Sequence, residues 1–354
     1  MKKNKTEASP LLASPGDGSA GKLPAGVSLL CESDYEAYMA DENLRWRRDY
    51  VSQGEFKTYD GLSLRYYTAR QEKSRQARAC VVMIHGYCGF WCKFHEMAEY
   101  YWRAGYEVFF LEQRGHGYSG RQVEAEDLVH VDDYGDYVRD LHSFMEGIVG
   151  PQTGGLAHIL FAHSMGGAVG ALCLEEYAGD FDAAILSSPM LAVKTNGLPR
   201  FVIPLLRAKI KILRQEKEPF RGSKPWTGEP SFESSSAMSL KRYNYIFEKR
   251  LKDDHYHTNR MSGGWVAASF RATKKALKRA DRIHIPILLF SAGNDALVDI
   301  AGHFEFAGKT ENTQWILYEN AKHELFNADD AIRKDYYARI FSFLARFDRP
   351  DQSS

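Results

Sequence analysis

The chain has 354 residues, 44% of them hydrophobic, and equal numbers of acidic and basic side chains, so its formal net charge is zero. This length is enough for one large α/β domain with an insertion or for two domains, and a neutral chain has no overall field that would select nucleic acid as its partner. The five cysteines have no metal-like or disulfide-like spacing, which indicates free thiols in a reducing compartment.

Residues 1–25 are rich in Lys, Ser, Pro, Gly and Ala, which predicts a disordered leader. Polar residues follow the basic start of the chain, so no signal peptide is indicated, and no apolar run reaches the length of a membrane span. We therefore expect a cytoplasmic protein that meets a membrane only peripherally. The remaining predicted segments are a first core part, a basic helical cap, a second core part and a tail, at 26–190, 191–280, 281–348 and 349–354.

The core segments show strands that alternate with helices. Residues 54–70 alternate about a turn at 59–61 and predict an antiparallel hairpin. Continuous apolar runs predict buried parallel strands at 79–84, 106–111, 157–164, 181–186, 285–290 and 313–318. Helical spacing predicts helices near 33–50, 91–104, 133–148 and 329–347. This order is typical of an α/β fold with a doubly wound, mostly parallel sheet.

The alternation stops at 191–280, and we interpret this stretch as a helical cap inserted after the sixth strand. It contains 20 Lys and Arg against 7 Asp and Glu, a net charge of +13. Within it, residues 198–217 interleave large apolar side chains with basic ones. Such a segment either lies on an anionic membrane surface or packs on the core with a solvated basic face, and the sequence leaves both interpretations open.

The motif Phe-Ala-His-Ser-Met-Gly-Gly at 161–167 carries the strongest chemical signal. It joins a buried strand to a run of small and apolar residues that suits a buried helix. A serine at so tight a turn is a nucleophile elbow, which requires small residues two positions before and after it. Ala162 and Gly166 meet this requirement, so Ser164 is the candidate nucleophile.

Two later residues complete a catalytic set in the order that this elbow requires, because Asp295 and His323 each follow a predicted buried strand. In these roles His323 takes the proton of Ser164 and returns it to the leaving group, while Asp295 holds the imidazole in the correct tautomer. Asp299 is the alternative acid, and it is less favoured because it lies further into the following helix.

Backbone amides next to this serine are predicted to stabilise an oxyanion. One is the amide of Met165 at the helix start, and the other is the amide of Tyr87, which follows His85 and Gly86 after a buried strand. Gly86 and His163 are the candidates for contact with substrate, although an extended strand turns His163 away from the serine and favours packing over catalysis. The loop at 114–117 is interpreted as structural, a tight turn around a charge-paired arginine.

Together these motifs resemble the monoacylglycerol lipase and lysophospholipase group of α/β-hydrolases over about residues 55–345. Two cap elements, at 239–243 and 263–266, are most similar to those of bacterial lysophospholipases. The resemblance implies the α/β-hydrolase fold and a carboxylic-ester hydrolase without a cofactor. Two positions depart from the pattern, Ala162 where glycine is usual and Glu112 where aspartate often precedes Arg-Gly-x-Gly. The matching motifs are His85-Gly86-Tyr87, Arg114-Gly115-His116-Gly117-Tyr118-Ser119, His163-Ser164-Met165-Gly166-Gly167, Gly293-Asn294-Asp295 and Lys322-His323-Glu324.

We therefore expect a serine esterase that acts on an amphiphilic monoacyl lipid, as a lysophospholipase with monoacylglycerol lipase activity as the related option. The basic cap favours a phosphate-bearing substrate and offers contact with an anionic membrane. No metal is expected, because His255 and His257 lack further ligands in sequence. An aminopeptidase-type serine peptidase is one alternative, but it would need an acidic patch for the substrate amino terminus. A non-catalytic binding protein of the same fold is the other, and it has no need of a complete Ser-Asp-His set.

Overall fold

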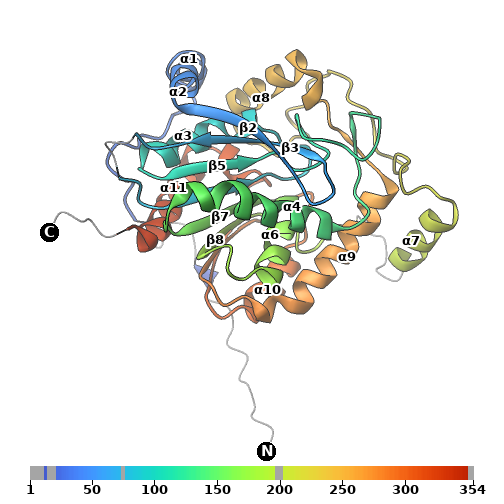
Figure 1. The fold of residues 1–354 in the computed structure, drawn as a ribbon. Helices are drawn as coiled ribbons and strands as arrows, with labels where there is room; N and C mark the ends of the chain where they lie inside the picture. The colour runs from blue at the N-terminus through green and yellow to red at the C-terminus, as the bar shows by residue number, and fades with distance from the viewer. Residues whose placement is uncertain (1–11, 14–20, 73–75, 196–201, 350–354) are drawn as a thin grey trace, which may run out of the picture.

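The computed structural model describes residues 12–13, 21–72, 76–195 and 202–349, and within them the chain forms a nine-stranded sheet (Figure 1). The strand order is β1-β11-β10-β8-β7-β4-β5-β3-β2. Only β2–β3 and β3–β5 pair antiparallel, so the predicted hairpin lies at the edge of a mostly parallel sheet. The strands are β1 (Leu12–Ala13), β2 (Val51–Lys57), β3 (Ser63–Ala69), β4 (Cys80–Ile84), β5 (Glu107–Leu111), β7 (His158–His163), β8 (Ala183–Ser187), β10 (Ile287–Ala292) and β11 (Thr313–Tyr318).

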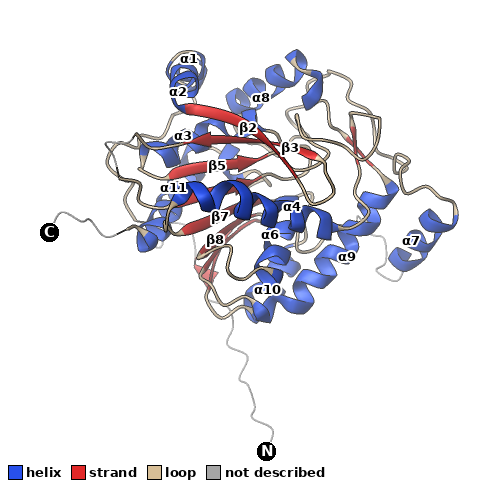
Figure 2. Ribbon diagram, in the orientation of Figure 1, coloured by secondary structure: helices blue, strands red, loops and turns tan. Residues whose placement is uncertain are grey.

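Side chains of the central strands alternate between two apolar cores, one on each face of the sheet. In β4, Val82 and Ile84 enter one core, and Val81 and Met83 enter the other. Both faces are covered by helices (Figure 2), which explains why these strands are apolar at most positions on both sides. The first face carries α4 (Tyr134–Phe144), α6 (Met165–Glu176), α9 (Gly263–Arg279) and α10 (Ile300–Lys309), and the second carries α2 (Glu42–Tyr50), α3 (His95–Arg103) and α11 (Asp330–Leu344).

Three predicted helices differ in detail from the observed ones. The helix expected near 33–50 is two helices, because α1 (Tyr35–Ala40) ends at Asp41 and α2 begins directly after it. The helix expected at 91–104 begins with a 3₁₀ turn, Trp91–Phe94, and α4 ends in a π-helical turn, Met145–Val149, before the short α5 (Gly150–Thr153). Among the described residues, no helix combines the length and the apolar character that a membrane crossing requires.

The cap contains α7 (Val202–Ile212), α8 (Leu240–Lys252) and β9 (Arg260–Met261), which pairs with β6 (Leu128–Val129). Helix α9 lies inside the predicted cap boundary, yet its face of Ala268, Ala272 and Ala276 is buried in the core that also contains α6. Alanines four residues apart form one helix face, so residues 263–280 belong to the core and the cap ends earlier than predicted.

The predicted leader is not disordered throughout. Leu12–Ala13 forms the short strand β1, which pairs in parallel with Trp315 and Ile316 of β11, so the prediction does not hold for these two residues. The rest of the leader up to residue 20, and residues 350–354 of the predicted tail, lie outside the described residues.

Candidate active site

Ser164 occupies the turn between β7 and α6 with a strained backbone, at φ 55° and ψ −118°. The turn has room only for small neighbours. A Cβ placed on Gly166 would lie 2.5 Å from the carbonyl oxygen of His85, and one on Gly167 would lie 2.3 Å from Cβ of Pro189. The two glycines are therefore required by the close approach of other chain segments, and they hold the serine at the carboxyl edge of the sheet.

The alanine at position 162, where the family pattern has glycine, fits because a glycine faces it. A Cβ on Gly170 would lie 3.2 Å from Cβ of Ala162 and 2.8 Å from Cδ2 of Leu160. The methyl group of Ala162 thus occupies space that Gly170 leaves free, and the departure leaves the geometry of the turn intact.

The three side chains predicted as a catalytic set lie in one hydrogen-bonded row. Oγ of Ser164 lies 2.7 Å from Nε2 of His323, and Nδ1 of His323 lies 2.5 Å from Oδ2 of Asp295. The other carboxylate oxygen of Asp295 accepts the backbone amides of Leu297 and Val298, at 2.8 and 3.0 Å. All three side chains are almost completely buried.

The charge state of this row follows from its contacts. Burial raises the pKa of the Asp295 carboxyl, but the hydrogen bond and charge of His323 and the two backbone amides outweigh burial, so the pKa lies below its ordinary value. Asp295 is therefore a carboxylate that accepts the Nδ1 proton of His323, which leaves Nε2 free to accept the proton of Ser164. The alternative acid, Asp299, caps α10 by accepting the amide of Ala301 at 3.0 Å.

The loop after β4 is braced by its own histidine. Nε2 of His85 accepts the backbone amide of Gln113 at 2.9 Å, and Nδ1 lies 2.7 Å from the carbonyl oxygen of Gly86. The side chain of Gln113 also donates to the carbonyl oxygen of His85, at 2.6 Å. Burial lowers the pKa of His85 to about 4, so the ring is neutral, with its proton on Nδ1. The sequence prediction missed Gln113, although its place at the end of the strand beside β4 was a usable signal.

The two amides predicted for the oxyanion hole belong to residues that adjoin the nucleophile. Met165 is the first residue of α6, and Tyr87 follows Gly86, where an added Cβ would lie 2.7 Å from Cβ of Ser164. Neither amide has an acceptor among the residues that the structure describes. The ring of Tyr87 packs on Trp265, and its hydroxyl donates to the carbonyl oxygen of Asn259 at 3.0 Å. Two backbone amides without an acceptor, next to the serine and held in place by packing, are what an oxyanion hole requires.

Gly86→Ala is expected to lower kcat for ester hydrolysis about 10²-fold or more, because the methyl group would push the loop away from Ser164 and displace one oxyanion donor. The measurement is steady-state hydrolysis of a p-nitrophenyl ester, with the melting temperature recorded alongside. Gly179→Ala is the matched control, since a Cβ there meets nothing within 4 Å. A Gly86→Ala variant with the wild-type kcat would contradict the assigned loop geometry.

His163 packs against the imidazole of His323. Its Nδ1 lies 3.0 Å from the carbonyl oxygen of Ser187, and its ring centre lies 4.9 Å from that of His323 and 5.0 Å from that of Phe326. Burial and the neighbouring His323 lower the pKa of His163 well below its usual value, so its ring is neutral. These contacts agree with the packing interpretation, and contact of His163 or Gly86 with substrate stays a prediction.

Arg114 and Glu112 hold the loop after β5. Arg114 is buried and pairs with both oxygens of Asp140 at 2.6 Å and with Asp60 at 2.9 Å, which confirms the structural interpretation of this loop. Glu112 is fully buried, and its two oxygens accept the amides of Trp91 and Tyr118 at 3.0 and 2.9 Å. Burial raises the pKa of Glu112 to about 7, in spite of these two hydrogen bonds.

This raised pKa predicts that part of the free energy of unfolding is lost as the pH rises from about 4.5 to about 7. In that window the folded protein keeps a proton on Glu112 that the unfolded chain releases, so the contribution is complete below the unfolded pKa. Glu112→Gln should flatten this part of the pH profile, measured by urea unfolding at pH values across the window. The exposed Glu124→Gln is the control, and equal slopes in wild type and Glu112→Gln would refute the expectation.

The sheet, the strained serine after a parallel strand, and the hydrogen-bonded histidine and aspartate on later loops define an α/β-hydrolase. The motifs had indicated this class. More narrowly, the family described as serine aminopeptidase, S33, matches residues 75–330, and the chain belongs to this family.

Relatives are similar to the chain over most of its length, and a solved structure shares its fold. The chain is 28% identical to lysophospholipase L2 of Escherichia coli (strain K12), over 86% of this chain and 90% of that protein. It is 27% identical to a monoacylglycerol lipase of Mycolicibacterium smegmatis, over 71% of this chain and 82% of that protein. Its fold matches a thermostable carboxyl esterase from Bacillus coagulans in complex with glycerol, with a TM-score of 0.68 and 17% identity over 84% of this chain and 99% of that one.

Proposed function

We propose that this chain is a serine hydrolase that cleaves the carboxylic ester of monoacyl lipids, with lysophospholipids as the first substrate class and monoacylglycerols as the second. The observation that carries the proposal is the hydrogen-bonded row of Ser164, His323 and Asp295 beside the amides of Tyr87 and Met165. The two relatives named lysophospholipase L2 and monoacylglycerol lipase support the choice of a monoacyl lipid.

The geometry supports a two-step acyl transfer. Oγ of Ser164 attacks the ester carbonyl while Nε2 of His323 takes its proton, and the amides of Tyr87 and Met165 hold the oxyanion. The imidazolium then gives this proton to the departing alcohol as the carbon–oxygen bond breaks, which leaves an acyl ester on Ser164. Water repeats the sequence, with His323 as base and then as acid, and releases a fatty acid and the free serine. Asp295 stays ionised throughout and stabilises the imidazolium.

A peptidase that binds a substrate amino terminus would need a carboxylate with uncompensated charge near this row. Glu324 follows the catalytic histidine directly, but it is buried and ion-paired with Lys93, and it also accepts from Asn327 at 2.8 Å. Its charge is therefore already compensated. The stretch 191–280 carries a net charge of +13, which repels an ammonium group and attracts a phosphate.

The direct test combines an active-site probe with a substrate panel. A fluorophosphonate should label the wild-type chain and fail to label Ser164→Ala, and a lysophospholipid and a monoacylglycerol should be hydrolysed at least tenfold faster than an aminoacyl p-nitroanilide. Faster cleavage of the aminoacyl substrate would replace the esterase proposal with the peptidase one. Absence of labelling and of turnover on all three substrates would favour a non-catalytic binding protein.

The helix α7 is the part of the cap that we propose meets an anionic membrane surface. It lies at the rim of the molecule, away from the sheet (Figure 1). Leu205, Ile212 and Leu213 are exposed at 67%, 78% and 51%, and the exposed Lys209 lies between Leu205 and Ile212 on the same helix face. Exposed apolar side chains beside basic ones suit the interface of an anionic bilayer. Phe201 and the start of the predicted basic segment lie outside the described residues.

Leu205→Ser and Ile212→Ser are each expected to weaken binding to vesicles with anionic lipid about tenfold, because each removes an apolar side chain from the bilayer interface. The measurement is co-sedimentation with vesicles of phosphatidylcholine alone and of phosphatidylcholine with phosphatidylglycerol. Leu240→Ser on α8 is the control, since Leu240 is also exposed, at 48%, but lies outside α7. Equal recovery with both vesicle types would contradict the membrane proposal.

A further inference from the structure

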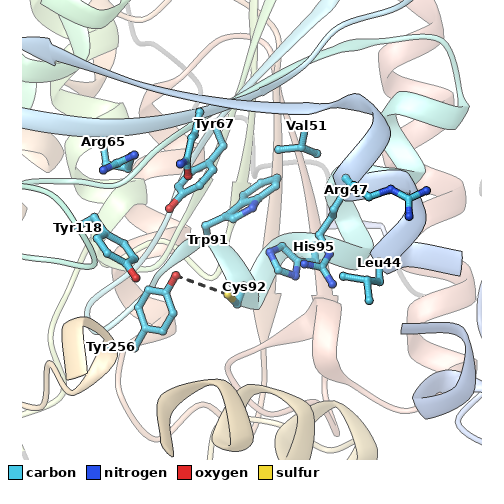
Figure 3. A pocket seen from close by; sticks show the side chains of 12 residues that line it. Leu44, Arg47, Val51, Arg65, Tyr67, Trp91, Cys92, His95, Tyr118 and Tyr256 are labelled. Carbon is cyan, nitrogen blue, oxygen red and sulfur yellow. Dashed lines mark hydrogen bonds between the residues drawn. The ribbon is translucent and has the colours of Figure 1, made fainter. Parts of the chain in front are cut away.

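A cavity of about 480 Å³ lies where α2, the edge strands β2 and β3, and the turn before α3 meet (Figure 3). Its volume is in the usual range for small-molecule sites. Within the part of the chain that the structure describes, its lining includes three arginines and no carboxylate. Ser164, Asp295, His323 and the loop from Gly86 to Tyr87 are not part of the lining, so the cavity is distinct from the candidate active site.

Aromatic rings form the middle of the cavity wall. Trp91 stacks on Tyr67, with ring centres 4.9 Å apart and an angle of 10° between the planes. Tyr118 and Tyr256 meet edge to face at 5.8 Å. Figure 3 shows Arg65 near Tyr118 and Tyr67 at one end of the row, and Arg47 near the other end. The wall therefore offers apolar surface between two cationic groups.

The cation at the second end has no acidic partner. Nε of Arg47 donates to the neutral side chain of Asn43 at 2.8 Å, and none of the described carboxylates lies within ion-pair distance of it. Arg65 pairs with Glu55 at 2.6 Å, but its Nε is buried without a hydrogen-bond partner. By contrast, Arg48 is exposed and satisfied by Asp49 at 2.8 Å. Positive charge in the cavity thus exceeds what the protein itself compensates.

A buried histidine at the same end adds a second, independent observation. His95 is 2% exposed, its Nδ1 lies 2.8 Å from the hydroxyl of Tyr245, and its Nε2 has no partner among the described residues. Burial, Arg47 and Lys249 lower the pKa of His95 well below its usual value, so the ring is neutral. The hydroxyl of Tyr245 is able to donate to Nδ1, and in that tautomer the ring proton lies on Nε2. Buried polar atoms are normally satisfied, and His95 thus gives the wall beside Arg47 a polar ring with one unfilled hydrogen bond.

We propose that this cavity binds a small anionic amphiphile, with its phosphate or carboxylate near Arg47 and His95 and its apolar part along Trp91, Tyr67 and Tyr256. A phosphate-bearing monoacyl lipid and a released fatty acid share this chemistry. The cavity also adjoins the end of the loop after β4, because Tyr256 stacks on Phe90 with ring centres 4.3 Å apart. Binding requires no hydrolysis, so the proposal stands apart from the proposed function.

The test uses the full chain with Ser164→Ala, which cannot turn over an ester, and isothermal titration with three probes below their micelle concentrations. The probes are dodecyl phosphate, laurate and the neutral 1-dodecylglycerol. At least one anionic probe is expected to bind one to one, at least tenfold more tightly than the neutral probe. Tighter binding of the phosphate indicates a lipid headgroup as the natural ligand, and tighter binding of laurate indicates the released fatty acid.

Two variants assign the binding to this cavity. Arg47→Gln should weaken binding of the anionic probe about tenfold or more through loss of a charged hydrogen bond. Gln53→Trp should abolish binding by filling the cavity, and it should fold because Gln53 is exposed on the edge strand β2. Arg45→Gln is the matched control, since Arg45 lies on the same helix, outside the cavity, and pairs with Asp41 at 2.8 Å.

Unchanged affinity in both Arg47→Gln and Gln53→Trp, or equal affinity for neutral and anionic probes, would overturn the inference. Failure of the hydrolase proposal would leave these results unaffected, because they are measured without turnover. In turn, loss of probe binding would leave labelling of Ser164 unaffected.

Discussion

Ser164→Ala and His323→Ala are each expected to lower kcat for ester hydrolysis by about 10⁴- to 10⁶-fold, because nucleophile and base act as one unit. Oγ of Ser164 lies 2.7 Å from Nε2 of His323, so removal of either group abolishes attack on the ester. For the same reason the double variant should be no slower than either single variant. Steady-state kinetics on a soluble ester test both the loss of kcat in the single variants and the rate of the double variant. The melting temperature of each variant checks that it is folded.

Asp295→Asn is expected to lower kcat about 10⁴-fold, because an amide favours the wrong tautomer of His323. Asp299→Asn is the matched control: Asp299 follows the same strand but caps α10, so its replacement should reduce stability slightly and leave kcat within about twofold. A large kcat effect at Asp299 with a small one at Asp295 would transfer the role of the acid to the other carboxylate.

The sequence located the three members of this row because each follows a buried parallel strand. Continuous apolar runs mark such strands, and in a parallel sheet their carboxyl ends meet at one edge, so Ser164, Asp295 and His323 were expected together. The brace between His85 and Gln113 follows the same logic, since β4 and β5 are neighbours, but only the coordinates show which atoms meet.

Other features depend on contacts that leave no local pattern. Helix α9 has a basic exposed side and a face of alanines, so its composition resembles that of the cap, while its burial against α6 places it in the core. The cavity that contains Arg47 and Arg65 is lined by residues of α2, β3 and the cap. These residues are far apart in the sequence, so no local pattern predicts that they meet. The buried ion pair between Glu96 and Arg242 also has no local sequence signal, because the two residues lie 146 positions apart along the chain.

Glu96→Gln is expected to lower the free energy of unfolding by about 3–5 kcal/mol, because it leaves two buried guanidinium groups without their shared carboxylate. Glu96 of α3 accepts from Arg242 of α8 at 2.9 Å through both oxygens and also pairs with Arg333 of α11. Both arginines are almost completely buried, and the hydroxyl of Tyr100 donates to the same carboxylate at 2.7 Å. The cluster thereby ties a cap helix to two core helices.

The pH dependence gives this prediction a specific sign. Burial raises the pKa of Glu96, but the charges of Arg333 and Arg242 outweigh burial, so the folded pKa lies below the ordinary value of 4.5. The contribution to stability is therefore complete above pH 4.5 and is lost as the pH falls through the folded pKa. Glu96→Gln should remove this acid-dependent loss.

Urea unfolding at pH 7 and pH 4 measures both effects. Glu305→Gln is the control for loss of a carboxylate, because Glu305 forms an exposed pair with Lys309 and its replacement should cost less than about 0.5 kcal/mol. Adding Arg242→Met to Glu96→Gln should recover part of the lost stability, since it removes a buried charge that has lost its buried partner and keeps only the partly exposed Glu32. A double variant less stable than Glu96→Gln alone would mean that Arg242 is satisfied by its remaining contacts, among them Glu32 at 3.1 Å and the carbonyl oxygen of Leu30 at 3.0 Å. In that case the cap helix α8 would be anchored through the segment before α1, independently of Glu96.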